Sequence, residues 1–225
     1  MATTITAQPP GTKRRLRMSY DEYRAWVSTE RRAEWVDGEV IELMSVKGRH
    51  ALVFGFLFVL LKQFVGARRL GLVLSEPFEM RILDGRSARQ PDIFVVLNEH
   101  LDRYSDERLN GPADLVIEIV SEGSVTEDRD EKKREYEAAG IPEYWIVEGR
   151  VNRSGIEMLS RSAGGRYESI RPDDDGSLHS RVLPGFWLKD SWLAADPLPD
   201  PLRVLRRIAP DAIEALLAET DVSDL

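Results

Sequence analysis

Three charged side chains in this 225-residue chain have the types and the spacing that hydrolytic chemistry uses: Asp92, Glu118 and Lys132. Asp92 follows Pro91 and precedes the apolar run "IFVVL", whereas Glu118 lies inside the apolar run "LVIEIV". An ionised carboxylate buried without a partner is so costly that it normally takes up a proton, so Glu118 needs a partner. The residues leave three explanations open for Glu118: an ion pair with a Lys or Arg, a sheet-end position that reaches water, or a metal site.

The elements that hold the two acids should bring them together. Because Pro91 cannot donate to a sheet ladder, a strand is expected to begin behind it, with Asp92 at its head and residues 93–97 buried. Glu118 lies in the next predicted buried strand. Two carboxylates on adjacent strands repel each other unless a divalent cation lies between them. The pair therefore favours a divalent-cation site, and because the chain has no cysteine the ligands of any metal must be oxygen or imidazole.

The helix that follows the Glu118 strand should add a lysine to this pair. Asp128, Lys132 and Tyr136 are spaced four apart, so they share one helical stripe. If Tyr136 faces the sheet, Lys132 does too. An ammonium aimed at a two-carboxylate metal site would orient a water or help to deprotonate it, and would stabilise charge that develops on a phosphate.

Capping and turn patterns delimit the elements around these residues. The capping-box pattern of residues 19–22 predicts a short helix over residues 20–27. The same pattern at residues 124–127 predicts a helix over residues 125–139, with Gly140 as its C-terminal stop.

Further patterns predict a hairpin, a buried helix and a bent strand. The Asp37-Gly38 pair lies between β-prone residues, which is the strongest short hairpin signal, and Glu34 lies beside this turn. Residues 48–64 are apolar nearly all round, which predicts a covered helix that ends near Gly66. The strand-like stretch that follows should bend at Pro77.

The order from residue 48 to residue 148 is therefore helix, three strands, helix, strand, and the later helix should join parallel strands. The predicted fold class is α/β (α+β), with a mixed sheet that N-terminal and C-terminal hairpins extend. Residues 1–17 are expected to form a flexible basic arm, residues 18–195 the domain, and residues 196–225 a Pro-rich linker and an amphipathic helix. That helix is expected to dock on the body or on a second subunit.

Composition narrows the function classes. A net charge of -8 argues against a general polyanion-binding protein, but not against a nucleic-acid enzyme whose carboxylates hold metal ions. The basic clusters of the chain are more simply explained as solvated surface charge. The absence of cysteine and of a signal-peptide pattern is typical of a cytoplasmic protein. The apolar stretch 51–64 is shorter than a membrane span, so we expect a buried helix and no membrane partner.

The sequence resembles the PD-(D/E)XK phosphodiesterase superfamily in three features: a Pro-Asp, a Glu inside an apolar strand, and a Lys that follows. The core of that superfamily has the same order of helices and strands. Several stretches are similar, in order and spacing, to the Uma-two-type family of restriction-endonuclease-like proteins over about residues 18–195: "EWVDGEVIELMS", "GRH", "QPDIFVV", "PADLVIEIVS", "DRDEKKREYEAAGIPEYWIV" and "LPGF". The resemblance implies a Mg²⁺- or Mn²⁺-dependent DNA endonuclease, and together with the apolar C-terminal helix it suggests a homodimer.

The resemblance also implies roles for single residues. Asp92 and Glu118 would be the metal-binding acids, and Glu34 a further acid near the site. The standard superfamily position of the lysine, two residues after the second acid, is occupied by Val120, so Lys132 would be the lysine displaced to the helix. Lys133 is the alternative.

Two positions leave questions open in this comparison. The chain has Ser121-Glu122-Gly123 where the family leads us to expect Ser-Pro, which would alter the loop beside the metal. His50 begins an apolar helix, where a histidine more often makes a structural hydrogen bond; the family likeness, in which a His recurs here, adds a functional role as the alternative.

Three functions remain as hypotheses. The first is the metal-dependent DNA endonuclease, with Asp92 and Glu118 on the ion, Lys132 positioning or activating the water, and Glu34 binding a second ion or the water. The second is a non-catalytic interaction protein that keeps the fold, with Glu118 and Lys132 as a structural ion pair. The third, a metal-dependent hydrolase of a small phosphate compound, ranks last because the chain has no glycine-rich phosphate loop.

Overall fold

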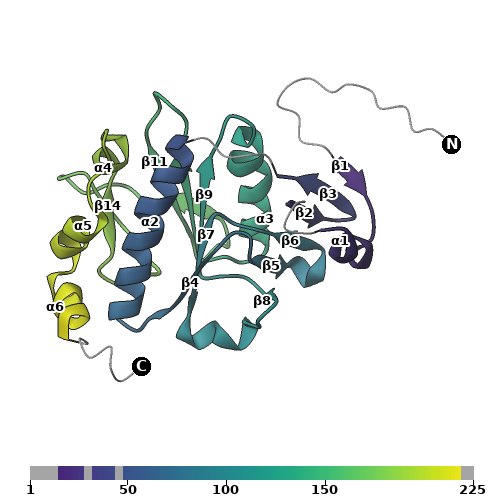
Figure 1. Ribbon diagram of the computed structural model, residues 1–225, viewed down its shortest axis with the longest axis horizontal. Coiled ribbons are helices and arrows are strands. Elements are labelled where there is room, and N and C mark those ends of the chain that lie inside the picture. The colour runs from purple at the N-terminus through teal and green to yellow at the C-terminus, as the bar shows by residue number, and fades with distance from the viewer. Residues whose placement is uncertain (1–14, 28–31, 44–47, 219–225) are drawn as a thin grey trace.

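The structure is a computed structural model that describes residues 15–27, 32–43 and 48–218 (Figure 1). The helices are α1 Tyr20–Trp26, α2 Gly48–Ala67, α3 Lys132–Ala138, α4 Asp190–Ala194, α5 Pro201–Ile208 and α6 Pro210–Ala218. Two 3₁₀ segments cover Leu83–Gly85 and Asn98–Arg103, and a π-helical segment covers Glu127–Glu131.

A mixed sheet of six strands, here called the central sheet, has the order β12-β11-β10-β9-β7-β4. Its strands are β4 Gly71–Ser75, β7 Ile93–Leu97, β9 Leu115–Val120, β10 Glu143–Glu148, β11 Ile156–Arg161 and β12 Tyr167–Ser169. β9 and β10 are parallel, with α3 between them in the chain, whereas β7 is antiparallel to both of its neighbours. The succession α2, β4, β7, β9, α3, β10 confirms the predicted order of the core.

A second sheet of six strands, here called the N-terminal sheet, has the order β1-β3-β2-β6-β5-β8. Its strands are β1 Arg15–Arg17, β2 Ala33–Val36, β3 Glu39–Glu42, β5 Glu79–Ile82, β6 Ser87–Arg89 and β8 Arg108–Asn110. The predicted hairpin is β2–β3, and both of its turn residues have positive φ, 47° at Asp37 and 86° at Gly38. The hairpin therefore builds a separate sheet with strands from residues 79–110, rather than extending the central sheet as we had expected.

The two faces of the central sheet carry different layers. Successive side chains of a strand point to opposite faces. In β9, Leu115 and Ile117 belong to the apolar cluster around α2, whereas Val116 and Val120 belong to the cluster that contains Tyr136 of α3. Glu118 has the parity of Val116 and Val120, so its side chain points toward α3. Figure 1 shows α2 and α3 on either side of these strands.

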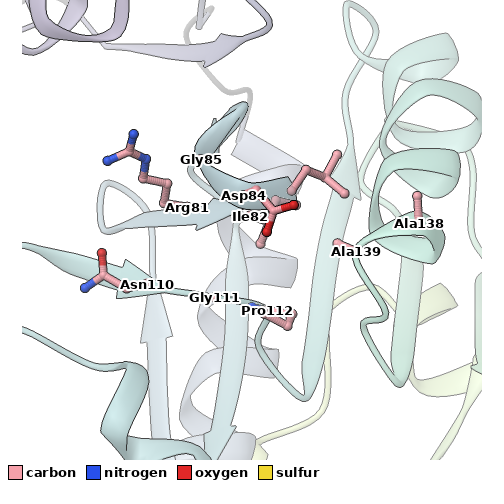
Figure 2. A pocket seen from close by; sticks show the side chains of 10 residues that line it. Arg81, Ile82, Asp84, Gly85, Asn110, Gly111, Pro112, Ala138 and Ala139 are labelled. Atoms are coloured by element: carbon pink, nitrogen blue, oxygen red, sulfur yellow. The ribbon is translucent and has the colours of Figure 1, made fainter.

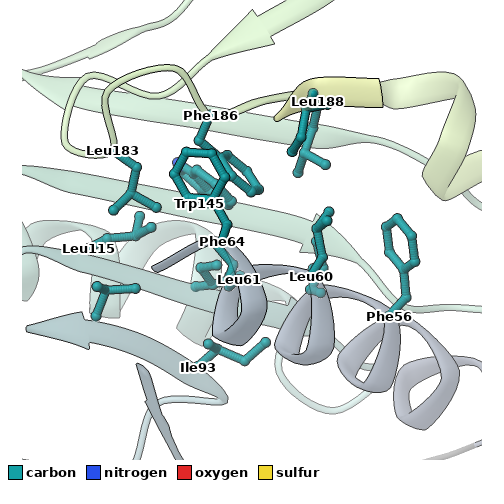
Figure 3. Close-up of a cluster of buried hydrophobic side chains, with 14 of the residues drawn as sticks. Phe56, Leu60, Leu61, Phe64, Ile93, Leu115, Trp145, Leu183, Phe186 and Leu188 are labelled. Carbon is teal, nitrogen blue, oxygen red and sulfur yellow. The ribbon is translucent and has the colours of Figure 1, made fainter. Parts of the chain in front are cut away.

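Helix α2 is the central helix of the larger core. Phe56, Leu60, Leu61 and Phe64 pack against strand residues such as Trp145 (Figure 3). The helix is 20 residues long, more than the predicted 48–64, and its length and composition alone would fit a membrane span. Its packing is that of a core helix, because it lies between the central sheet and helices α5 and α6.

Several expected local features differ in the structure. α2 continues through Gly66, and the left-handed residue beyond its end is Arg69, with φ 51°. The capping box at Ser19 is present, but the hydroxyl of Ser124 accepts from the backbone N–H of Ser121, and Glu127 accepts from Arg89. At Glu127 the reason is a distant partner, because Arg89 takes the carboxylate that the capping box would use.

The two ends of the chain also differ from expectation. Most of the expected arm lies outside the described residues, but Arg15–Arg17 form β1 and pair with β3. Of the predicted C-terminal hairpins, β11–β12 extends the central sheet, whereas β13 Ser177–His179 pairs with β14 Trp187–Lys189 in a small separate sheet. The C-terminal segment forms two helices, α5 and α6, which pack on α2 of the same chain.

Candidate functional site

A small pocket of about 60 Å³ lies where α2, β7 and α3 begin and β9 ends. Its polar lining comprises His50, Glu76, Gln90, Asp92, Glu118, Ser121, Ser124, Asp128 and Lys132. Of the predicted site residues, the structure thus brings Asp92, Glu118, Lys132 and His50 together at one pocket.

Asp92 stands at the head of β7 and ties three elements together. One carboxylate oxygen, Oδ2, accepts from the backbone N–H of Ile119 in β9 at 2.6 Å. The other, Oδ1, lies 3.4 Å from Nε2 of His50 in α2. Burial lowers the pKa of His50, but the hydrogen bond and charge of Asp92 raise it by more, so the net shift is upward. Asp92 is therefore fixed in place on one side, with its second oxygen directed to His50.

Glu118 lies on the α3 face of β9, where it is 3% exposed. Its Oε2 is 2.9 Å from Nζ of Lys132, and its Oε1 accepts from the hydroxyl of Tyr136 at 2.7 Å. Burial raises the pKa of Glu118 well above its usual value; Lys132 opposes this shift, and the nearby carboxylates of Asp92 and Asp128 add to it. A carboxylate in the middle of an apolar strand is thus tolerated because α3 supplies an ammonium and a hydroxyl.

Of the two candidate lysines, Lys132 and Lys133, Lys132 is the buried one. Its Nζ lies 3.4 Å from Asp128 and 3.7 Å from Glu34, in addition to the contact with Glu118. Burial lowers the pKa of Lys132, but these carboxylates raise it well above its usual value, so Lys132 is a protonated donor. Lys133 is partly exposed and lies 3.8 Å from Glu157 at the surface.

Lys132 follows directly on the π-helical segment Glu127–Glu131. π-Helical turns are frequent at functional sites, where they re-aim side chains within a helix. Asp128 lies in this segment, and with Lys132 it forms an i,i+4 contact that faces the sheet.

Glu34 is fully buried beside the pocket rather than on its wall. Its Oε2 is 2.9 Å from Nη1 of Arg89, and its Oε1 accepts from the backbone N–H of Gln90 at 2.9 Å. With Lys132 within 4 Å, this carboxylate connects the N-terminal sheet to the lysine.

Buried acids outnumber buried bases around the pocket. Five carboxyl groups are buried here: Glu34, Asp92, Glu118, Glu127 and Asp128. Two buried cations, Arg89 and Lys132, contact them. The imidazole of His50 beside Asp92 is a third buried base, so five carboxyl groups face three bases, and the protein can relieve this excess of acids by binding protons or a cation.

The donor set fits a hard divalent cation. Carboxylate oxygens and imidazole are ligands of Mg²⁺ and Mn²⁺. His50 lines the pocket, and its buried Nδ1 has no hydrogen-bond partner among the residues that the structure describes. The pocket volume exceeds the roughly 30 Å³ that one water occupies in the liquid, so an ion or water fits.

Sequence reasoning missed two members of this pocket, Glu76 and Gln90. Glu76 follows β4 and forms an ion pair with Arg32 of the N-terminal region. Burial raises the pKa of Glu76, and the charge of Asp92 raises it further, whereas Arg32 lowers it. The signal that was present is an acid directly after the apolar run "GLVLS", which mirrors the position of Asp92 directly before the apolar run "IFVVL".

Two other places in the described part of the chain bring polar side chains together. A wider pocket of about 520 Å³ lies at the far end of α3 from Lys132; Figure 2 shows Arg81, Asp84 and Asn110 around it. Asp84 is the one carboxylate among its lining residues. This pocket therefore lacks a set of metal ligands.

A group of potential metal ligands, Glu99, His100 and Asp114, lies at the opposite end of β7 and β9, with donor atoms within 4.8 Å of one another. Nδ1 of His100 is 2.7 Å from Oδ1 of Asp114, and Oδ2 of Asp114 accepts from the N–H of Leu97. The acid and the imidazole therefore satisfy each other without an ion.

Comparisons with known proteins agree with this architecture. A profile of the Uma2 family, described as "Putative restriction endonuclease", matches residues 20–194. A solved structure from Anabaena variabilis ATCC 29413, described as "a putative nuclease belonging to DUF820", is similar with a TM-score of 0.63 and 17% identity. The similarity covers 78% of this chain and 97% of that chain.

A structural likeness at this identity shows the fold alone, and it confirms a restriction-endonuclease-like fold. No curated protein matches the chain. Because the family profile spans most of the sequence, the chain belongs to the Uma2 family of restriction-endonuclease-like proteins.

Proposed function

We propose that this protein is a Mg²⁺- or Mn²⁺-dependent endonuclease that hydrolyses phosphodiester bonds in DNA. Its membership of a nuclease-like family supports nucleic acid as the substrate class. The observation that carries the metal dependence is the excess of buried carboxylates around a pocket that also contains an unpartnered imidazole nitrogen. Asp92 and Glu118 would hold the ion, and a homodimer and a cytoplasmic location remain predictions.

A divalent ion bound there would polarise the phosphate and lower the pKa of a water that attacks it. Residues of the chain would hold the two ligand carboxylates in position. Asp92 is kept in position by the N–H of Ile119, and Glu118 by Tyr136, so both ligand carboxylates are preorganised.

Lys132 would act by position and charge. Its pKa is raised well above the usual value, so it stays protonated and donates hydrogen bonds rather than removing a proton from water. An ammonium beside the phosphate stabilises the charge of the transition state. Glu34 would act through Lys132, because Arg89, Lys132 and the N–H of Gln90 surround its carboxylate.

The test combines thermal melting and plasmid cleavage on the same samples of wild type and Glu118→Gln, with and without Mn²⁺. We expect Mn²⁺ to raise the melting temperature of the wild type and to support nicking, and both effects to vanish in the variant. Asp114→Asn is the matched control, because it changes a buried acid at the other end of the same strand. Wild-type melting that ignores Mn²⁺, together with intact plasmid, would remove the basis of the proposal.

One observation favours the alternative of a non-catalytic protein. The 2.9 Å contact of Glu118 with Lys132, with Tyr136 on the other oxygen, is a satisfied ion pair without any metal. In that case Glu118→Gln should lower the melting temperature of the metal-free protein. The endonuclease proposal expects the reverse, since the variant removes one of the excess buried charges.

A further inference from the structure

A groove of about 430 Å³ adjoins the candidate metal pocket. The two share Glu76 and Gln90, which line both. The groove is apolar along Phe58 of α2, Val73 and Leu74 of β4, and Pro77 and Phe78 beyond it. Its polar lining beyond the shared residues consists of Arg24, Ser75, Glu79 and Glu107. A group bound in this groove would therefore lie next to whatever occupies the metal pocket.

Two aromatic side chains give the groove flat, supported walls. Phe58 stacks on Phe54, with ring centroids 5.5 Å apart and planes within 10° of parallel. Phe78 stacks against two rings of the protein, Tyr104 and Phe94, with centroids 5.6 Å and 6.3 Å away, so Phe58 is the ring on which the stacking argument rests. Aromatic faces held in this way favour a flat aromatic ligand.

Two buried acceptors in the groove have no hydrogen-bond donor among the residues that the structure describes: Oε1 of Gln90 and Oε2 of Glu79. Gln90 is 8% exposed and Glu79 is 2% exposed. Nη1 of Arg24 lies 3.6 Å from Oε2 of Glu79, which is an ion-pair distance but too long for a hydrogen bond. A ligand that satisfies these atoms must present hydrogen-bond donors, and the N–H groups of a nucleobase are donors of this kind.

We infer that this groove is a subsite for a nucleobase with an exocyclic amino group, on the nucleotide next to the scissile phosphate; this inference rests on the proposed function. A base supplies the flat ring and the N–H donors, and its phosphate is directed to the adjoining metal pocket. The carboxylates of Glu76 and Glu79 disfavour a phosphate inside the groove itself.

The subsite defines a class of substrate. A base can enter the groove only if it has left its stack in the duplex, which costs least in single-stranded or locally unpaired nucleic acid. The substrate is therefore single-stranded DNA, or DNA with an unpaired base at the cleavage point.

The test measures binding, not cleavage. Fluorescence anisotropy is recorded with labelled single-stranded dC and dT 12-mers, in Ca²⁺ and again in EDTA. Cytosine carries an exocyclic amino group where thymine carries an oxygen. We expect the wild type to bind dC several-fold more tightly than dT, and a mixed-sequence single strand more tightly than its duplex.

Variants localise the effect. Phe58→Ala should weaken binding of both oligonucleotides about tenfold through lost stacking. Leu52→Ala is the matched control, because Leu52 is exposed on the same helix and does not line the groove, and it should bind nearly as the wild type does. Gln90→Ala should abolish the preference for dC. The substitution keeps the hydrogen bond from the backbone N–H of residue 90 to Glu34. Melting temperatures check that each variant is folded.

The outcomes separate the subsite from the proposed function. Phe58-dependent binding with a preference for dC supports the subsite even if plasmid is never nicked. Plasmid nicking together with equal binding by the wild type, Phe58→Ala and Gln90→Ala overturns the subsite and leaves the endonuclease standing. Failure of the wild type to bind any of the oligonucleotides also overturns it.

Discussion

The two ends of the β7–β9 strand pair are built alike. At one end Asp92 precedes β7 and accepts from the N–H of Ile119 in β9. At the other, Asp114 precedes β9 and accepts from the N–H of Leu97 in β7. Each Asp therefore links its own strand to the neighbouring one across the antiparallel pair.

A histidine faces the second oxygen of each Asp, but the surroundings differ. His100 lies 2.7 Å from Asp114 and is about one-third exposed, whereas His50 lies 3.4 Å from Asp92 and is buried. Among the described residues, Glu118 and Lys132 lie at the Asp92 end of the strand pair and not at the Asp114 end. The comparison shows that an Asp–His pair at a strand end is a structural device, and that an excess of buried carboxylates distinguishes the candidate site.

The largest difference in plasmid nicking is expected between Asp92→Asn and Asp114→Asn, the asparagine substitutions at the two ends of the strand pair. Asp92→Asn removes a ligand charge and should lower Mn²⁺-dependent plasmid nicking by at least about 100-fold, since an ion with one ligand charge fewer is held and oriented less well. Asp114→Asn should retain nicking within a few-fold. Initial rates of nicking with folded samples check this; equal losses in both variants would contradict the assignment of the site to the Asp92 end.

Removing the lysine should have the next largest effect. Lys132→Met leaves Glu118, Asp128 and Glu34 without their shared cation, so it should destabilise the protein by about 3–5 kcal/mol. Lys133→Met, the matched surface control, should change stability by less than about 1 kcal/mol. Urea unfolding of the metal-free proteins measures both, and similar values would mean that Lys132 is not the main counter-ion.

The raised pKa of Glu118 predicts a pH dependence of stability. Because the pKa in the folded state lies above the ordinary value of 4.5, the unfolded chain loses the Glu118 proton first as pH rises. The metal-free protein should therefore lose stability as pH rises above 4.5 toward the raised pKa, and Glu118→Gln should flatten this loss.

Mn²⁺ competes with that proton, so the rise in melting temperature caused by Mn²⁺ should grow with pH in the wild type. Melting curves between about pH 5 and pH 8 follow both effects. A Mn²⁺ effect that is constant over this range would argue against Glu118 as a ligand.

The smallest effect is expected from His100→Ala. The His100–Asp114 pair is partly exposed, so its loss should cost less than about 1 kcal/mol. The change in melting temperature on addition of Mn²⁺ should equal that of the wild type. If the Mn²⁺ effect disappeared in this variant, the group Glu99, His100 and Asp114 would be the metal site.

Local signals were sufficient to predict the central strands and the hairpin. Pro91 placed the start of β7 at Ile93, and the Asp37-Gly38 turn formed with both residues at positive φ. Alternation along β9 then explains how Glu118 reaches α3, because each residue of a strand is fixed to one face.

Long-range contacts account for what the sequence did not predict. Glu76 enters the pocket through a bend between two sheets, and Glu127 turns to Arg89 instead of completing a capping box. The groups that shift the pKa of Glu118 and Lys132 lie in β2, β9, the π-helical segment and α3 and at Asp92 before β7. Such pairings depend on how distant segments pack, which no local pattern encodes.

Direct binding of Mn²⁺, followed by electron paramagnetic resonance of the free ion, tests the central claim most directly. The wild type and Asp114→Asn are predicted to bind Mn²⁺ alike, and Glu118→Gln and Asp92→Asn to lose that binding. Binding that survives in both of these variants and disappears in Asp114→Asn would contradict a metal site at the Asp92 end.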